Sequence, residues 1–474
     1  MEKHDENRLK SARSNKKNVN ILIFYNPLHV EIKTIAEHLI SFKKYSKFNI
    51  FYYPGSPKFY KAIDLDLFDA IIIHYSLRIH IEEGFDTLPK SLKKKIMGYS
   101  KLKILFIQDE YDQTNTAKKW IKRLQFNIVF TCVPKQYIES IYPQKEFPDT
   151  KFIQVLTGYV SDNLQTIPSL PISERKNYIN YRGRNLHWVY GDLGQEKWKI
   201  GQRMREICER KKIDVDIEWE EDKRIYGNEW YHFLVSAKST LGTESGSNIF
   251  DYNGTIRDKI NGYILLHPNT TYEDIYKRFL QPHDNLIKMN QVSPKLFEAI
   301  ALKTTLILFK GEYSGILKPN IHYIPLAKDF SNVEEVIEKI KNDALLQSIA
   351  NKAYTDIIKS QKYSYSSFIE FVDNTINLHL HNAPTHVNKN QLKAFMKEPF
   401  SALVIQQNHH SSTGSSFEKP SYASRLKILS VKLILNILKQ KQLNKIYHNT
   451  CHLVFYFFPF LKSAIIRLRC WILN

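Results

Sequence analysis

The sequence predicts an α/β protein with two Rossmann-like, doubly wound domains facing a cleft, followed by a basic, hydrophobic helical tail. Three observations predict this fold class. Short apolar runs alternate with amphipathic stretches. This alternation is interrupted by a proline-containing linker and then resumes, and after residue 424 the composition changes to basic and apolar residues. A chain of 474 residues has room for two or three domains of roughly 100–200 residues each.

The first domain is predicted over residues 19–165, after a polar N-terminal segment at 1–18. Its strands are expected in six β-branched and aromatic runs: NILIFY, NIFYY, DAIIIHY, KILFIQDE, NIVFTCV and FIQVLTGY. These runs are apolar throughout and do not alternate, which is typical of parallel strands buried on both faces. We therefore expect a parallel sheet with helices on both sides.

The second domain is predicted over residues 177–380. Residues 166–176 contain two prolines and several polar side chains, the composition of an exposed interdomain linker. The rhythm then restarts, with strands and helices expected in NYINYRGR, EKWKIGQRMREICERKK, DVDIEW and SPKLFEAIALKTTLILF. Two such domains in series leave a cleft between them, and open parallel sheets bind ligands at the carboxyl ends of their strands.

The C-terminal region has a different composition. Residues 382–424 include NHHSSTGSS and little periodic apolar content, so we interpret them as a flexible linker. Residues 425–474 contain nine Lys or Arg and no Asp or Glu among long apolar clusters. On a helix, Arg425, Lys432, Asn436 and Lys439 fall along one narrow stripe. Since no run of 18 apolar residues occurs, we expect this tail to bind an anionic membrane surface without crossing it.

A net charge of +20 indicates an anionic partner, but charge alone does not distinguish nucleic acid, phosphate-bearing substrate and lipid headgroups. No recognition helix, KH loop, RNP motif or zinc finger is visible, so a nucleic-acid partner is not expected. The first twenty residues are polar and predict no signal peptide. We expect a cytoplasmic protein, peripheral on the inner face of the membrane.

Four segments of the second half carry a family resemblance. They are YRGR at 181–184, EKWK at 196–199, GTESG at 242–246 and SPKLFEAIALKTTLILF at 293–309. In their order and spacing they resemble the donor-binding domain of GT-B glycosyltransferases, especially the group-1 branch of bacterial cell-surface polysaccharide synthesis. The resemblance covers residues 177–360, and 19–165 only by overall pattern. It implies a hexosyltransferase-type enzyme that moves a sugar from a nucleotide-sugar donor to a polysaccharide, lipid-linked or protein acceptor.

The resemblance also implies donor-binding residues. The family's Gly-Arg turn and following lysine hold the donor diphosphate, which matches Arg184 and Lys197, with Arg182 in the same turn. Fixed cations there stabilise the charge of the departing diphosphate without a metal. Glu298 matches the glutamate that accepts hydrogen bonds from the ribose hydroxyls. Eight positions earlier the family has a second acid, whereas this chain has Asn290, which leaves the sugar-facing role of that position open.

The turn after the strand at STLGT supplies three further donor-binding candidates. Ser245 and Gly246 are small enough for backbone amides to approach a phosphate or sugar, and Glu244 can bind hydroxyls. The alternative is a plain strand-ending turn, in which Gly246 serves the backbone alone.

In the first domain, His74 and the pair Asp109 and Glu110 follow two apolar strands at their carboxyl ends. If the reaction inverts the anomeric centre, one of them is the candidate general base for the acceptor hydroxyl. The alternatives are a hydrogen-bonded histidine at the sheet end and carboxylates that cap a helix.

No metal or cofactor is expected beyond the nucleotide-sugar substrate. Asp64-Leu65-Asp66 and Asp214-Val215-Asp216 match the D-x-D metal motif of another glycosyltransferase fold, but neither is placed to converge on substrate phosphates. Two other hypotheses remain: a catalytically silent GT-B protein that binds a sugar nucleotide or scaffolds an assembly, and a basic nucleic-acid-binding protein. The sequence leaves the sugar, the acceptor and the stereochemistry open.

Overall fold

The computed structural model describes residues 19–55, 63–81 and 88–380. The predicted N-terminal segment at 1–18, the linker at 382–424 and the tail at 425–474 lie outside the described residues. Among the helices within the described ranges, none is long and apolar enough to cross a membrane.

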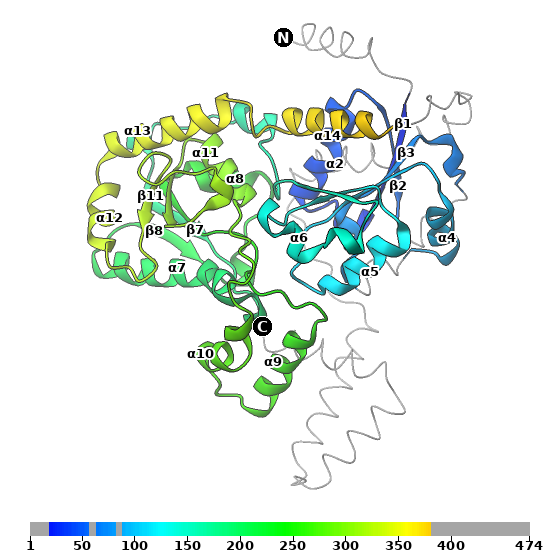
Figure 1. The fold of residues 1–474 in the computed structure, drawn as a ribbon. Helices are drawn as coiled ribbons and strands as arrows, with labels where there is room; N and C mark the ends of the chain where they lie inside the picture. Colours follow the sequence, from blue (N-terminus) through cyan, green and yellow to red (C-terminus); the bar gives the residue numbers. More distant parts are fainter. Residues whose placement is uncertain (1–18, 56–62, 82–87, 381–474) are drawn as a thin grey trace, which may run out of the picture. The chain divides into compact units, whose positions relative to one another are not determined.

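The first domain is a six-stranded parallel sheet with strand order β2-β1-β3-β4-β5-β6 (Figure 1). The strands are β1 (Asn20–Tyr25), β2 (Asn49–Pro54), β3 (Ala70–Ile73), β4 (Leu102–Phe106), β5 (Ile128–Thr131) and β6 (Lys151–Gln154). The helices are α2 (Lys33–Tyr45), α4 (Lys90–Gly98), α5 (Thr114–Leu124) and α6 (Ile138–Ile141). Strands β1, β3, β4 and β5 are buried along their whole length, which explains their unbroken apolar sequences. Helix α2 covers one face, and α4 and α5 cover the other.

The second domain is a five-stranded parallel sheet with strand order β11-β10-β9-β7-β8. Its strands are β7 (Asn177–Arg182), β8 (Val215–Glu218), β9 (Ala237–Gly242), β10 (Thr305–Phe309) and β11 (Tyr323–Leu326). Its main helices are α7 (Gly191–Arg210), α8 (Gly227–Val235), α11 (Pro294–Ala301), α12 (Val333–Ile340) and α13 (Asp343–Ala353). Helices α8 and α11 pack on one face, and α7, α12 and α13 on the other. Because β8 and β9 lie on opposite sides of β7, the topological switch point falls between β7 and β9.

The last described helix returns to the first domain. A π-helical turn (Tyr354–Lys359) follows α13, and α14 (Tyr365–His379) then packs with α2 (Figure 1). Phe368 of α14 lies in the same apolar cluster as Phe42 and Phe106 of the first domain. Asp373 accepts a hydrogen bond from Ser46 Oγ at 2.9 Å. The predicted second domain at 177–380 therefore includes a helix that packs with the first, since this apolar face is buried by distant residues.

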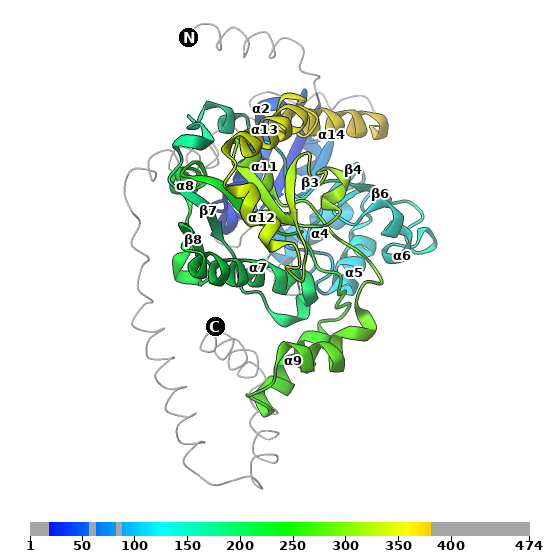
Figure 2. The same cartoon turned by 90° about the vertical axis from the view of Figure 1, so that its left-hand side faces the viewer.

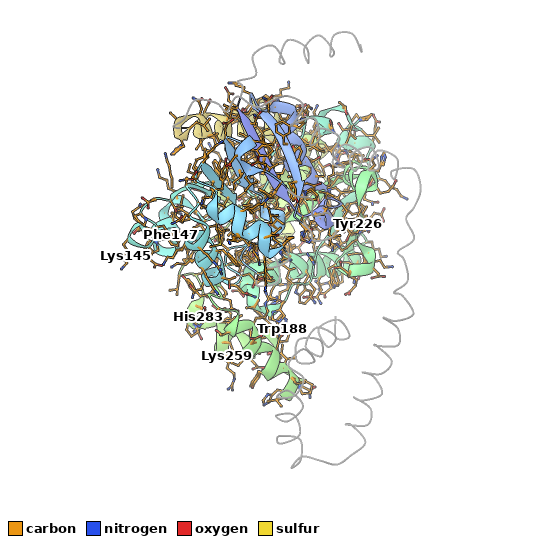
Figure 3. All side chains as sticks on the ribbon, turned by 90° about the vertical axis from the view of Figure 1, so that its right-hand side faces the viewer. Lys145, Phe147, Trp188, Tyr226, Lys259 and His283 are labelled. Carbon is orange, nitrogen blue, oxygen red and sulfur yellow. The ribbon has the colours of Figure 1, made fainter. Side chains whose placement is uncertain are left out.

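A helical insertion lies between β9 and α11. It contains α9 (Thr255–Leu266), α10 (Tyr272–Ile275), a π-helical turn (Tyr276–Leu280) and a 3₁₀ turn (Gln281–His283), and it extends away from the second sheet in both views (Figures 1 and 2). Figure 3 labels Lys259 and His283 in this insertion. The insertion has an apolar cluster of its own, which includes Ile256 and Ile260. It also contacts the first domain, where Arg257 Nη2 lies 3.1 Å from Asp112 Oδ2.

Contacts join the strand ends of the first domain to the segment before α11. Thr157 Oγ1 donates a hydrogen bond to the Val292 carbonyl at 3.0 Å, and Gln291 Nε2 donates to the Cys132 carbonyl. The segment that leads into α11 is therefore held by residues beyond β5 and β6. This brings the carboxyl ends of first-domain strands toward the candidate site of the second domain.

Candidate functional site

The candidate site is built at the switch point of the second sheet. The loop after β7 carries Gly183 and Arg184, and the loop after β9 carries Glu244 and Ser245. A Cβ on Gly183 would lie 2.5 Å from the Lys197 carbonyl, so α7 can approach the end of β7 only because residue 183 has no side chain. These close approaches set the position of Lys197 relative to both loops.

Lys197 reaches from α7 to the loop after β9. Its Nζ donates hydrogen bonds to the Glu244 carbonyl at 3.0 Å and to Ser245 Oγ at 3.3 Å. Tyr181 Oη donates to the Lys197 carbonyl at 2.7 Å, which fixes the helix against β7. Desolvation, together with the positive charge of Lys295, lowers the pKa of Lys197 to about 8. The ammonium is thus enclosed and close to a second cation.

Lys295 stands in the first turn of α11, a helix that begins with Pro294 and has no side-chain cap. Its side chain keeps contact with solvent, yet the protein around its ammonium lowers its pKa by desolvation, and Arg224 and Arg184 lower it further against the effect of Glu298. Arg184 is exposed and lies 4.0 Å from Glu221. Lys295, Lys197 and Arg184 are therefore close to the N-terminus of α11, which has no side-chain cap. This arrangement of positive charges favours the binding of an anion.

Glu298 lies one helical turn beyond Lys295, on α11. Trp230 Nε1 donates a hydrogen bond to its Oε2 at 2.7 Å. Within the described residues its other oxygen has no protein hydrogen bond, so one acceptor is available to a ligand. Burial raises the pKa of Glu298, while the Trp230 hydrogen bond and the charges of Lys33 and Lys295 oppose the rise. Since Lys33 belongs to α2, the first domain contributes to the surroundings of this carboxylate.

Glu244 has a structural role in this geometry. Its Oε1 accepts hydrogen bonds from the backbone amides of Glu312 at 2.7 Å and Tyr313 at 2.9 Å, and its Oε2 accepts from Asn290 Nδ2. The side chain therefore holds the loop after β10, because both of its oxygens have protein donors. A Cβ on Gly311 would lie 2.6 Å from the Glu244 carboxyl carbon. This corrects the expectation that Glu244 binds the donor directly.

Ser245 and Gly246 shape the backbone beside Glu244. Ser245 exchanges backbone hydrogen bonds with Gln291 at 2.8 and 2.9 Å. Gly246 has a φ of +99°, and a Cβ there would lie 2.7 Å from the Met289 Cβ. Gly246 therefore serves backbone geometry, whereas the Ser245 hydroxyl also accepts from Lys197.

Arg182 is not free to bind a donor. Its Nη1 and Nη2 donate to the two Asp216 carboxylate oxygens at 2.7 and 3.1 Å, and its Nε donates to the Lys223 carbonyl at 3.0 Å. The guanidinium also lies 4.3 Å from the centroid of the Phe233 ring. The expectation for Arg182 is therefore corrected, since a bidentate pair between β7 and β8 occupies it.

His74 lies in the core of the first domain. Its side chain is fully buried, with Nδ1 2.9 Å from Ser76 Oγ and Nε2 3.0 Å from His38 Nδ1. Burial and the neighbouring His38 lower the pKa of His74. Both ring nitrogens are occupied, so His74 is not placed to accept a proton from an acceptor hydroxyl. Of the two hypotheses for His74, a general base or a hydrogen-bonded histidine at the sheet end, the structure agrees with the second.

Asp109 and Glu110 point to different environments. Glu110 is fully buried, accepts from Thr131 Oγ1, and has a pKa raised to about 7 by burial. Asp109 is exposed, has a φ of +59°, and accepts a hydrogen bond from Tyr111 Oη at 2.7 Å. Its charge acts on Lys197 across the two domains. Glu110 therefore belongs to the core, and Asp109 is the exposed member of the pair.

Sequence reasoning missed three contributors: Lys295, Trp230 and Lys33. Lys295 stands within the segment that carried the resemblance, and its position in the first turn of an expected helix was the available signal. Trp230 and Lys33 are identified only by their proximity to Glu298 in the folded chain. Within the described residues, no group of three or more His, Cys, Asp or Glu side chains is arranged to hold a metal ion.

No family model and no curated protein matches this chain. Among solved structures it is similar to an α-glucosyltransferase in complex with UDP-glucose and DNA containing an abasic site, with 12% identity, 76% of this chain and 98% of that chain covered, and a TM-score of 0.46. It is also similar to HepE of Anabaena in complex with UDP (11% identity, coverage 76% and 99%, TM-score 0.40). AviGT4, a glycosyltransferase of avilamycin A biosynthesis, shows 11% identity, coverage of 77% and 99%, and a TM-score of 0.36.

The fold is therefore described from the two sheets themselves. Both are parallel, both reverse their strand order beside the first strand, and both carry helices on two faces. The chain therefore has two Rossmann-like, doubly wound domains in series, with the candidate site at the switch point of the second sheet.

Proposed function

We propose that this protein is a glycosyltransferase that takes a sugar from a nucleotide-sugar donor. The observation that carries the proposal is the gathering of Arg184, Lys197 and Lys295 beside Glu298, whose second oxygen has no protein hydrogen bond in the described part of the chain. Cations suit a diphosphate, and a carboxylate oxygen suits a ribose hydroxyl. A nucleoside diphosphate presents both kinds of group.

The chemistry follows from the charges. When the glycosidic bond of the donor breaks, the leaving diphosphate gains negative charge, and preorganised cations lower the energy of that state more than that of the bound donor. Lys197 is held by two hydrogen bonds before any ligand arrives, so little reorganisation is required. Three side-chain cations supply charge that a metal ion supplies elsewhere, and we therefore propose metal-independent transfer.

The acceptor is proposed to approach from the first domain. Asp109 is exposed, and its charge reaches Lys197, so we propose it as the general base if the reaction inverts the anomeric centre. We propose that the acceptor is a cell-surface polysaccharide or its precursor glycan, a lipid-linked molecule or a protein, on the strength of the sequence resemblance. A catalytically silent sugar-nucleotide binder is the second candidate, because Asn290 replaces the family's first acid and bonds Asn248 and Glu244.

Screening the purified chain against a panel of nucleotide sugars tests this proposal. A donor should raise the melting temperature by binding the folded state, and slow donor hydrolysis should follow. Stabilisation without hydrolysis or transfer would favour the silent binder. Salt-sensitive binding to DNA or RNA, with no response to any nucleotide sugar, would favour a nucleic-acid-binding protein and contradict the proposal.

From its sequence, we also propose that the tail at 425–474 holds the protein on an anionic membrane at the inner face. Deleting residues 420–474 should release the protein from anionic liposomes in a flotation assay, because each basic residue near such a surface contributes about 1 kcal/mol. The truncated chain should still bind its donor. Aggregation, or loss of donor binding, would show that the tail is part of the fold and contradict the membrane assignment.

A further inference from the structure

A second polar site adjoins the cation cluster. A pocket of about 270 Å³ opens where the start of α7, the end of the helical insertion and the loops after β10 and β11 meet. Its polar lining residues are Asp192, Glu196, Asn248, Asp284, Asn285, Lys288, Asn290, Glu312 and Lys328. This volume is slightly below the range of roughly 300–1,000 Å³ for drug-sized ligands, so it suits a single small molecule such as one sugar ring.

The charge of the lining excludes a diphosphate here. Four carboxylates and two ammonium groups line the pocket, which gives a formal charge of −2. Lys328 Nζ lies 2.6 Å from Glu196 Oε1, so one ammonium is already paired. A metal ion is not the expected ligand either, because no group of three or more potential ligands among the described residues is arranged to hold one. The ligand of this pocket should be neutral or cationic.

Three carboxamides in the pocket are fixed in place. Asn248 Nδ2 donates to Asn285 Oδ1 and to Asn290 Oδ1, each at 3.1 Å, and Asn248 Oδ1 accepts from the Met289 amide at 2.9 Å. Asn285 and Asn290 have φ values of +58° and +30°, a region that asparagine tolerates better than most residues. Because these side chains are already ordered, binding a ligand to them costs little conformational entropy.

One buried acceptor in the pocket lacks a partner. Oε2 of Glu196 is buried and has no hydrogen-bond partner in the described part of the chain. Burial raises the pKa of Glu196, and Lys328 opposes that rise. A buried carboxylate oxygen without a donor is destabilising, and a ligand hydroxyl would satisfy it.

We propose that this pocket binds a neutral, hydroxyl-rich sugar ring and discriminates against acidic sugars. Carboxylates and carboxamides offer paired acceptors and donors that match neighbouring hydroxyls, and the net negative lining repels a sugar carboxylate. Glu196 adjoins Lys197 in α7, so the ring lies beside the diphosphate site. The identification of the ring as part of the donor or of the acceptor rests on the proposed function. The preference of the pocket for a neutral sugar ring does not, because it follows from the lining residues.

Saturation-transfer NMR on the full chain with glucose, glucosamine and glucuronate tests this proposal. Glucose and glucosamine should bind at millimolar concentration, and glucuronate at least about tenfold more weakly. Asn248→Ala should abolish glucose binding. A double variant, Asp284→Asn with Glu312→Gln, removes two charges and should bring glucuronate to within about threefold of glucose. Glu335→Gln on α12, a matched charge loss outside the pocket, should change nothing.

Nucleotide ligands separate the two sources. If the ring is the donor's, Asn248→Ala weakens binding of the nucleotide sugar and leaves the nucleoside diphosphate unaffected. If it belongs to the acceptor, neither nucleotide ligand is affected, and glucose still binds the nucleotide-loaded protein. Glucose binding without binding of any nucleotide would contradict the proposed function but would still support the sugar pocket. Equal binding of glucose and glucuronate by the parent protein, or unchanged glucose binding by folded Asn248→Ala, would overturn the sugar pocket.

Discussion

Removing the Lys197 ammonium should change how nucleoside diphosphate affinity depends on pH. The pKa of Lys197 is lowered to about 8 by desolvation, and a diphosphate binds the ammonium form. Raising the pH above about 8 therefore lowers affinity, because the proton must be regained before the anion can bind. Between about pH 7 and about pH 9 the protonated fraction falls roughly tenfold, which corresponds to about 1.4 kcal/mol.

The variant Lys197→Met lacks this proton. At neutral pH it should bind a nucleoside diphosphate about 10- to 100-fold more weakly, the range for loss of a hydrogen bond to a charged group of 1.5–3 kcal/mol. The gap between parent and variant should then shrink about tenfold by pH 9. Lys295 also has a lowered pKa and titrates in both proteins, so the ratio of the two affinities removes most of its contribution.

Isothermal titration calorimetry at several pH values measures both affinities. Lys199→Met is the matched control, since Lys199 lies on the same helix with its ammonium 4.7 Å from the centroid of the Tyr272 ring. It should keep the pH dependence of the parent. Thermal unfolding verifies that each variant is folded. A parent affinity that is constant from neutral pH to pH 9, or a gap that does not shrink, would refute the assignment of Lys197 to the diphosphate.

Three further predictions follow from the same geometry. Glu298→Ala should weaken donor binding by about 1–3 kcal/mol in calorimetry because a ribose acceptor is lost, and unchanged affinity for every donor would remove Glu298 from the site. Arg184→Ala should lower kcat more than donor affinity, and EDTA should have little effect; activity lost on chelation and restored by manganese would favour a metal mechanism. In the parent protein, the free energy of unfolding should fall by about 3 kcal/mol as pH rises from 4.5 to about 7, because Glu110 ionises at lower pH in the unfolded chain than in the folded one. Glu110→Gln should remove this fall. A pH profile in urea unfolding that the mutation leaves unchanged would contradict the buried, protonated carboxyl.

The fold could be predicted because its strands are buried on both faces. Sequences such as NILIFY and TLILF leave no polar edge, and only a covered parallel sheet accommodates several such runs in succession. The return of α14 to the first domain could not be predicted, since its apolar face is completed by Phe42 and Phe106, far away in sequence. Periodicity identifies a buried face but not the element that buries it.

The family resemblance predicted Lys197 and Glu298 as donor-binding residues, and in the folded chain the charge of Lys295 acts on both. The roles of Arg182 and Glu244 depend on partners supplied by tertiary structure, Asp216 on the neighbouring strand and the amides after β10. A charged side chain beside a turn has the same sequence signal whether it binds a ligand or another part of the chain.

A crystal structure of this chain with a bound nucleoside diphosphate is the most direct test of the donor site. We expect density for the diphosphate among Arg184, Lys197 and Lys295, with a ribose hydroxyl within hydrogen-bond distance of the Glu298 carboxylate. Density for the nucleotide at another place, with these four side chains unchanged and without contact to it, would contradict the account.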